Sequence, residues 1–431
     1  MSTLHRSTLH RSTGYEATDE TVDGTVGEAV DRAVDGTTPR FPDTLSARPP
    51  LEPVRVEPYG DGRGFPSVAR GGERVAGLDG LRTVAVVLVI VYHVRPDLVP
   101  GGSVGVDVFF TISGFVITRL LVAEYARTGN IGLWPFYRRR WLRLVPALLL
   151  MCAVTALLSL TLRLPLFDGA WAAAGLAAAS VVNLVRAAEP GTYSGLTAPL
   201  GHTWSLGVEE QFYLAWPLLL LVLLRSARAR TVVGCTAALC VLPVLWRTVL
   251  WDPSAAHRIY NGPDTRADQL LVGALLALVL ARLRADDPRL ALLRRRAERL
   301  CLPALVVLAL VAWRIPITGS GAWNPAWYTV GFLVAAVLTA VVIATLALSP
   351  RAWPSRLLSL SAPAWVGRNL SYGMYLWHYP AVRLLAGLGV TDDWLLPVGL
   401  MATSAAALAS YVLVERPLTR RPRTAPAKAS R

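Results

Sequence analysis

Long uninterrupted apolar blocks dominate this sequence from residue 78 onward. The blocks are roughly 16 to 22 residues long and recur about eleven times, and a helix of about 20 residues crosses a hydrocarbon core of ~30 Å. Only 17% of the 431 residues are charged, whereas an ordinary soluble domain has about 25%. These features exclude a soluble globular protein. They predict an all-α fold class, a polytopic bundle of membrane helices.

Arginine clusters between the blocks predict how the helices cross the membrane. The blocks cover residues 78–94, 102–123, 144–163, 170–186, 206–224, 231–251, 268–283, 300–315, 327–348, 367–388 and 394–414. Short cytoplasmic loops carry an excess of arginine, and the clusters all lie on one side only if the Ala-rich block 170–186 is re-entrant or peripheral. We therefore predict about ten transmembrane helices in the plasma membrane, with both termini in the cytoplasm.

Composition divides the chain into three parts. Residues 1–74 lack an apolar run, so we expect a disordered cytoplasmic tail before a membrane domain at 75–418 and a basic cytoplasmic tail at 419–431. The net charge of +14 is concentrated in interhelical loops, which argues for membrane topology and against nucleic-acid binding. The four cysteines have no metal-ligand spacing, so we expect packing roles for them and no metal site.

The first block contains the basic residues Arg82 and His93. Eleven helical residues make about three turns, so both side chains lie on one helix face, about 16 Å apart. Ionisable side chains inside a membrane span are costly and usually mark functional sites. The alternative is that Arg82 extends to the cytoplasmic interface and His93 ends the helix on the other side.

Polar motifs recur in the later blocks. They occupy residues 101–115, 136–147, 202–213, 266–274, 370–380 and 415–418. In this order, and together with Arg82 and His93, they make the sequence resemble the integral-membrane acyltransferase 3 family. Members of that family O-acylate polysaccharides, cell-wall glycans, lipids and macrolide antibiotics, with acyl-CoA as the donor.

The resemblance implies that Arg82 and His93 are the family's signature pair. The thioester of acyl-CoA is then expected to reach His93 along the bundle interior while the nucleotide stays cytoplasmic, and about 16 Å is a plausible reach for a pantetheine arm. Arginine suits the phosphates because its fork makes bidentate charge-assisted bonds. We therefore expect acyl-CoA as a co-substrate and no tightly bound cofactor. A cytoplasmic cluster is a further candidate for acyl-CoA binding, or else a topology signal alone: Arg138, Arg139, Arg140 and Arg143.

His93 is the strongest candidate for a base in the first two blocks, because an unperturbed histidine titrates near working pH. We expect its neutral imidazole to take the proton of an acceptor hydroxyl, which attacks the thioester carbonyl. A ping-pong route with the acyl group first on His93 or Ser113 is the second mechanism. Asp107 is expected either to orient the imidazole or to begin a helix at an interface. Ser113 is alternatively a small residue that permits close helix packing.

Adjacent carboxylates at Glu209 and Glu210 point about 100° apart on a helix, so they cannot share a partner. We expect Glu209 to face the acceptor in a catalytic role and Glu210 to pair with an arginine. Arg266 and Asp268, which begin the seventh block, are expected to contact a hydroxylated acceptor or each other.

Three residues receive mainly structural roles. Tyr372 and His378 lie in an aromatic-rich block, where we expect structural support and a histidine with satisfied hydrogen bonds. We expect His202 in a loop or at an interface.

The sequence thus predicts a membrane O-acyltransferase. It moves an acetyl or other short acyl group to a hydroxyl of a glycan, a lipid-linked sugar or a macrolide-type acceptor. The alternatives are a transporter or flippase of acyl groups or glycans, which also needs buried charges, and a scaffold of an envelope-synthesis complex. Some members of the family carry an esterase-like domain after the last span. This sequence ends 13 residues beyond Leu418, so we expect a stand-alone membrane domain.

Overall fold

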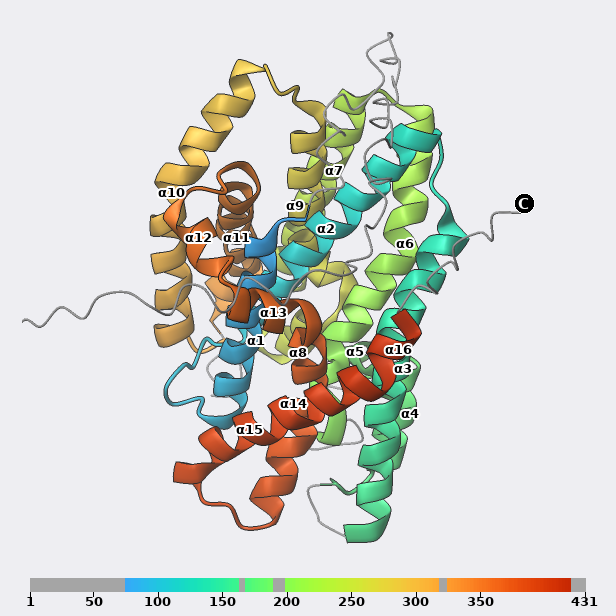
Figure 1. The fold of residues 1–431 in the computed structure, drawn as a ribbon, viewed down its shortest axis with the longest axis vertical. Coiled ribbons are helices and arrows are strands. Elements are labelled where there is room, and N and C mark those ends of the chain that lie inside the picture. Colours follow the sequence, from blue (N-terminus) through green and yellow to red (C-terminus); the bar gives the residue numbers. More distant parts are fainter. Residues whose placement is uncertain (1–73, 163–166, 189–197, 318–323, 420–431) are drawn as a thin grey trace, which may run out of the picture. The chain divides into compact units, whose positions relative to one another are not determined.

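The computed structural model describes residues 74–162, 167–188, 198–317 and 324–419, and their regular elements are all helical (Figure 1). The tails predicted at 1–74 and 419–431 lie outside these residues, apart from Arg74 and Thr419. Each of the eleven apolar blocks contains a helix. The all-α fold class predicted from the sequence is confirmed.

The helices follow one another with short connections. They are α1 (Ala76–Val94), α2 (Val104–Thr128), α3 (Leu133–Leu162), α4 (Ala170–Ala178), α5 (Val182–Ala188), α6 (Trp204–Ser226), α7 (Ala229–Leu250), α8 (Ala256–Asn261), α9 (Pro263–Arg282), α10 (Pro288–Arg314), α11 (Phe332–Leu348), α12 (Trp353–Leu358), α13 (Ser361–Asn369), α14 (Ser371–Gly387), α15 (Asp392–Ser410) and α16 (Arg416–Thr419). Shorter turns are η4 (Ala198–Thr203), η5 (Pro253–Ala255), η6 (Trp327–Gly331) and η7 (Tyr411–Glu415).

Seven helices in the described part of the chain are long and apolar enough to cross a membrane, or eight if one bent pair counts as a span. The chain is therefore a multi-pass membrane protein, although the predicted number of ten crossings is not confirmed. Three predicted spans fail the criterion for physical reasons. Helix α9 carries Asp264, Arg266 and Asp268 in its first two turns, the first half of α10 is rich in arginine, and α14 has only 17 residues.

The Ala-rich block predicted to be re-entrant or peripheral is broken. Helices α4 and α5 meet at 113°. The turn is fixed against α6 by Asn183 and Gln211, whose side-chain amides exchange two hydrogen bonds of 3.0 Å. Gln211 also donates to the Ser180 carbonyl at 3.1 Å. This bend is the geometry that the re-entrant prediction requires.

Helix α2 lies at the centre of the bundle and is the most deeply buried of the candidate spans. In Figure 1, α1, α2 and α9 lie between α10 at one edge and α3 at the other. Helices α2 and α9 approach closely through two glycines. A β-carbon on Gly114 would lie 1.8 Å from the Leu270 carbonyl oxygen, and one on Gly273 would lie 2.0 Å from the Thr111 carbonyl oxygen. Small residues allow such contact between membrane helices.

Two buried ion pairs join α9 to its neighbours. Arg266 donates to Asp107 of α2 at 2.6 Å, and Arg247 of α7 binds both carboxylate oxygens of Asp268 at 2.9 and 2.8 Å. The four side chains are at most 2% exposed. The Arg266 guanidinium also lies 3.8 Å from the centre of the Phe332 ring. Buried charges need such partners, so these pairs specify how α2, α7 and α9 pack.

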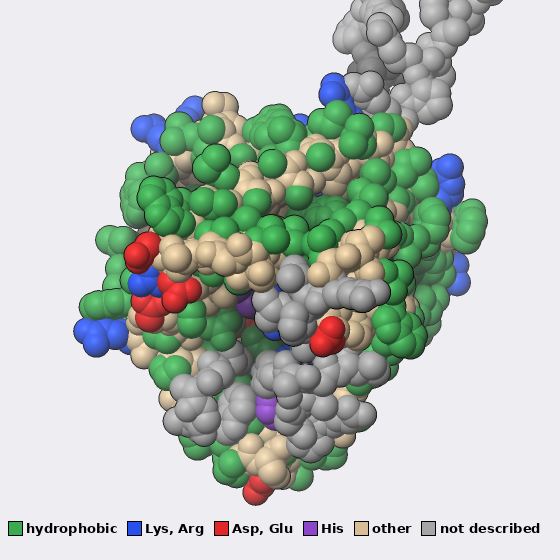
Figure 2. All heavy atoms as spheres, turned by 90° about the horizontal axis from the view of Figure 1, so that it is seen from below, with side chains coloured by type: hydrophobic (Ala, Val, Ile, Leu, Met, Phe, Trp, Pro, Cys, Tyr) green, Lys and Arg blue, Asp and Glu red, His purple; other side chains and the backbone are tan. Residues whose placement is uncertain are grey.

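The outer surface of the bundle is apolar, as a lipid-facing surface requires. Many large hydrophobic side chains are exposed, and they include Trp134, Trp171 and Trp394. Figure 2 shows hydrophobic side chains over much of the lower end of the molecule, with histidine side chains visible among them.

Candidate active site

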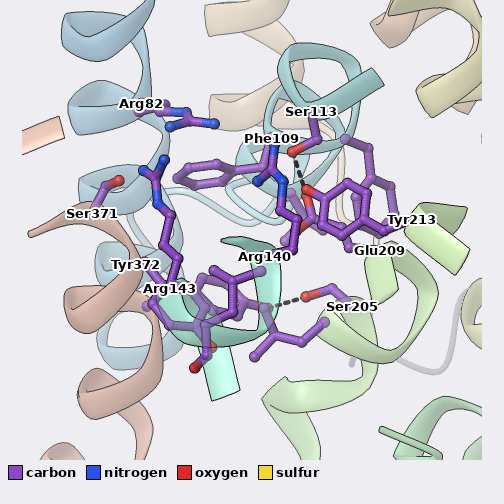
Figure 3. A pocket seen from close by; sticks show the side chains of 15 residues that line it. Arg82, Phe109, Ser113, Arg140, Arg143, Ser205, Glu209, Tyr213, Ser371 and Tyr372 are labelled. Carbon is purple, nitrogen blue, oxygen red and sulfur yellow. Dashed lines mark hydrogen bonds between the residues drawn. The ribbon is translucent and has the colours of Figure 1, made fainter. Parts of the chain in front are cut away.

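A pocket with an empty volume of about 620 Å³, part of it open to solvent, lies between five helices. Its walls come from α1, α2, α3, α6 and α14 (Figure 3). The lining residues are Arg82, Val106, Phe109, Phe110, Ser113, Arg140, Arg143, Leu144, Ser205, Leu206, Glu209, Tyr213, Ser371, Tyr372 and Tyr375. Residues from four of the polar motifs therefore share one cavity with Arg82.

Three of the lining residues are arginines. Arg82 comes from α1, and Arg140 and Arg143 lie about one turn apart on α3 (Figure 3). None of them forms an ion pair within the described residues, and the buried Nε of Arg82 has no hydrogen-bond partner there. Arg140 lies 4.9 Å from the centre of the Tyr213 ring. Three guanidinium groups without a carboxylate partner suit a ligand that carries several negative charges.

The other two arginines of the predicted cluster lie elsewhere on α3. Arg138 and Arg139 are exposed and do not line the pocket that the described residues form. Arg139 lies 3.8 Å from Glu124, in a contact open to solvent. On a helix Arg138 points about 160° away from Arg140, whereas Arg139 points only about 40° away from Arg143. The helical period therefore explains the position of Arg138 but not that of Arg139.

A hydroxyl and a carboxylate meet on the pocket wall. The Ser113 Oγ atom donates a hydrogen bond of 2.7 Å to Glu209 Oε1 (Figure 3). Glu209 thus lines the cavity, and the catalytic role toward an acceptor stays a prediction. The adjacent Glu210 is half-buried and makes no salt bridge within the described residues, so the arginine partner expected for it is not found. Tyr372 lines the same pocket and donates to the Leu144 carbonyl at 2.9 Å.

Tyr375 connects this pocket to a group of histidines. Its hydroxyl donates to the His202 carbonyl at 2.8 Å and lies 2.5 Å from Ser205 Oγ, which donates in turn. The backbone carbonyl of Tyr375 accepts a hydrogen bond of 2.7 Å from His378 Nδ1. Tyr375 therefore belongs to the pocket through its ring and to the histidine group through its backbone.

The histidine group consists of His93, His202 and His378. The ring centres of His93 and His378 are 4.9 Å apart, and those of His202 and His378 are 5.2 Å apart. His202 lies in the short turn η4 that precedes α6, where it is only 3% exposed and stacks on Tyr379 at 4.9 Å. His93 is not one of the lining residues. It contacts His378, whose ring centre lies 5.5 Å from that of the lining residue Tyr375.

The structure gives Asp107 a different partner from the one we expected. Its carboxylate accepts from Arg266, and no described residue connects it to His93. Arg266 and Asp268 do not pair with each other either, because Asp268 is held by Arg247. The sequence analysis did not single out Arg247. The sequence feature that could have indicated Arg247 is its position near the end of an apolar block. An arginine there is buried only when a partner neutralises its charge.

Other site residues also escaped the sequence analysis. Tyr213, Ser205 and Tyr375 lie in motifs that we recognised, yet their types carry no distinctive pattern. The described residues hold no group of three or more His, Cys, Asp or Glu side chains arranged to bind a metal ion.

Comparison with known proteins assigns the chain to a family. The family described as an acyltransferase domain matches residues 75–415, which include the whole pocket and all three histidines. The chain belongs to this acyltransferase family. It is 32% identical over 352 residues to the peptidoglycan O-acetyltransferase OatA of Listeria monocytogenes, covering 80% of this chain and 56% of that protein. It is also 32% identical to the putative peptidoglycan O-acetyltransferase YrhL of Bacillus subtilis, with coverage of 80% and 55%.

A third relative has nearly the same match. The O-acetyltransferase OatA of Staphylococcus aureus strain NCTC 8325 is 31% identical over 354 residues, covering 80% of this chain and 57% of that protein. The chain thus spans a little more than half the length of these relatives. No solved structure matches.

Proposed function

We propose that this protein is a membrane O-acyltransferase that moves an acetyl group from acetyl-CoA to a hydroxyl of a cell-wall glycan. One observation carries the proposal. A cavity lined by three arginines is also lined by Tyr375, whose carbonyl binds His378, and His378 in turn contacts His93 near the end of α1. The names of the relatives support the acetyl group and the peptidoglycan acceptor. The protein acts in the plasma membrane, with both termini in the cytoplasm.

The arginine cluster Arg82, Arg140 and Arg143 is proposed to bind the phosphates of the donor. Its guanidinium groups face one cavity and have no carboxylate partner among the described residues, so a polyanion would neutralise them. From there the pantetheine arm extends along α1 toward Tyr375 and His93, over about 16 Å. The aromatic walls formed by Phe109 and Phe110 are suited to its apolar parts.

His93 is proposed as the general base. Its Nε2 atom takes the proton of the acceptor hydroxyl, and the hydroxyl oxygen attacks the thioester carbonyl carbon. The carbon–sulfur bond then breaks, and the proton on Nε2 passes to the sulfur of CoA. The products are the acetyl ester and free CoA, and His93 returns to its neutral form.

A two-step route has its own supporting observation. The Ser113–Glu209 hydrogen bond of 2.7 Å lies inside the cavity, whereas His93 does not line it. In this route Glu209 takes the Ser113 proton, Oγ attacks the thioester, and the proton passes to the departing sulfur. Glu209 next takes the proton of the acceptor hydroxyl, whose oxygen attacks the seryl ester carbonyl carbon. The bond from that carbon to Ser113 Oγ breaks, and the proton returns to Oγ. An acetylated Ser113 trapped without acceptor distinguishes this route from direct transfer.

The experiment uses the full chain in lipid nanodiscs, with labelled acetyl-CoA and peptidoglycan fragments. We expect labelled ester on the glycan in wild-type protein and its loss in His93→Ala. A transporter would instead carry label across sealed vesicles without forming an ester, and a scaffold would do neither. Either result overturns the proposed function. Full turnover by His93→Ala overturns only the base.

A further inference from the structure

Two histidines that lie far apart in the sequence of the membrane domain are in direct contact. Nε2 of His378, on α14, lies 3.3 Å from Nδ1 of His93, on α1. Each ring is also held by a backbone carbonyl one turn earlier in its own helix. His93 Nδ1 lies 2.9 Å from the Val89 carbonyl oxygen, and His378 Nδ1 lies 2.7 Å from the Tyr375 carbonyl oxygen.

These carbonyls decide where the protons are. A carbonyl oxygen only accepts, so both Nδ1 atoms must carry a proton when the rings are neutral. His378 Nε2 is then unprotonated, and its lone pair points toward the Nδ1–H group of His93. That N–H group is shared between His378 Nε2 and the Val89 carbonyl oxygen. The same reasoning leaves His93 Nε2 unprotonated, and no described residue hydrogen-bonds to it. The tautomer that a general base needs is thus fixed by packing.

In the described part of the chain, no carboxylate accepts a hydrogen bond from His93 Nδ1. Asp107 is held by Arg266, and Glu209 is held by Ser113 on the pocket wall. The ionisable groups that face His93 are Arg186 of α5, His202 of η4, and Tyr379, His378 and Arg383 of α14. Of these, His378 alone presents a hydrogen-bond acceptor to the His93 ring.

We propose that His378 is the positioning residue of His93. Together with the Val89 carbonyl it holds the Nδ1–H side of the imidazole, so that Nε2 faces the acceptor hydroxyl. Its own Nε2 accepts a hydrogen bond from Nδ1–H when His93 becomes positively charged. In a catalytic triad a carboxylate does this. The proposal rests on the proposed function, in which His93 is the base.

Two substitutions separate the parts of this role. His378→Gln places an amide oxygen near the position of Nε2 and keeps an acceptor for His93. His378→Asn keeps an amide N–H for the Tyr375 carbonyl and removes that acceptor. We expect His378→Asn to lower kcat about 10- to 100-fold, the effect of one hydrogen bond to a charged group, with KM for acetyl-CoA unchanged. His378→Gln should stay within a few-fold of wild type.

Equal activity of both variants and wild type overturns the proposal, because His93 then needs no acceptor. Equal loss in both variants also overturns it, because the ring then serves packing alone. Gel filtration and thermal unfolding of each variant establish that it is folded.

A second measurement needs no substitution at His378. NMR of protein labelled at the histidine ring nitrogens, with His93→Ala to assign the signal, reports the tautomer of His93. We expect the proton on Nδ1, and a proton on Nε2 overturns the pairing. This result stands even if no ester forms in any assay, so failure of the proposed function and failure of the pairing are distinguishable.

Discussion

Nε2 of His378 lies 3.3 Å from Nδ1 of His93, although 285 positions separate these residues in the sequence. The contact is made by α1 and α14, which pack side by side in the bundle. The surroundings of the proposed base are therefore a product of tertiary packing. They form only when the first and next-to-last long helices of the domain come together.

Replacing His93 tests the chemistry. His93→Ala removes the group that takes the acceptor proton, so we expect kcat to fall on the order of 100- to 10,000-fold. KM for acetyl-CoA should change little, because the donor phosphates bind elsewhere. Initial rates with labelled donor measure both constants. His257→Ala, in α8 and outside the histidine group, is the control and should keep full activity. A comparable loss in this control contradicts the assignment.

Replacing the pocket arginines tests donor binding. We expect Arg82→Ala and Arg140→Ala each to raise KM for acetyl-CoA about 10- to 100-fold, the effect of losing a charge-assisted hydrogen bond. The matched controls are Arg138→Ala and Arg139→Ala, which remove the same charge from the exposed side of α3. Steady-state kinetics at fixed ionic strength make the comparison. If all four variants behave alike, net charge rather than the pocket controls binding.

The buried pair of Arg247 and Asp268 is expected to stabilise the fold. Asp268→Asn leaves Arg247 buried without a counter-charge, so the free energy of unfolding should fall by about 3–5 kcal/mol. Asp264→Asn breaks a similar pair with Arg258 that is open to solvent, and it should cost about 0–1 kcal/mol. Denaturant unfolding in detergent compares the two variants. A smaller loss from Asp268→Asn than from Asp264→Asn refutes this account.

The close approach of α2 and α9 gives a test of packing. Gly114→Ala forces a β-carbon against the Leu270 carbonyl, and we expect a loss of stability of about 1–3 kcal/mol. Gly234 has no atom within 4 Å of such a carbon, so Gly234→Ala should be neutral or stabilising by up to about 1 kcal/mol. Melting temperatures in the same detergent rank the variants, and an unchanged value for Gly114→Ala is the unfavourable result.

Much of the fold was predictable because a membrane helix is determined by its own local sequence. An apolar block must become a helix in lipid, whichever helices surround it. The number of crossings was not predictable in the same way. The charges of α9 and the arginines of α10 obscure their apolar character, and their burial depends on neighbours.

The sequence indicated many of the residues of the candidate site. It did not indicate which of them contact one another. Glu209 was expected to face the acceptor, and the structure places it on the pocket wall. The partner of Asp107 was missed because it lies 159 positions away, on α9. Which buried groups meet depends on how each helix is rotated about its axis, and one sequence does not encode that in any local pattern. For the same reason the contact between His378 and His93 was not predicted.

Tyr375 is both a wall of the arginine pocket and, through its carbonyl, the anchor of His378. The pocket wall and the hydrogen bond that orients the His378 ring therefore depend on the same residue. A substitution that displaces the backbone at Tyr375 is expected to disturb both together.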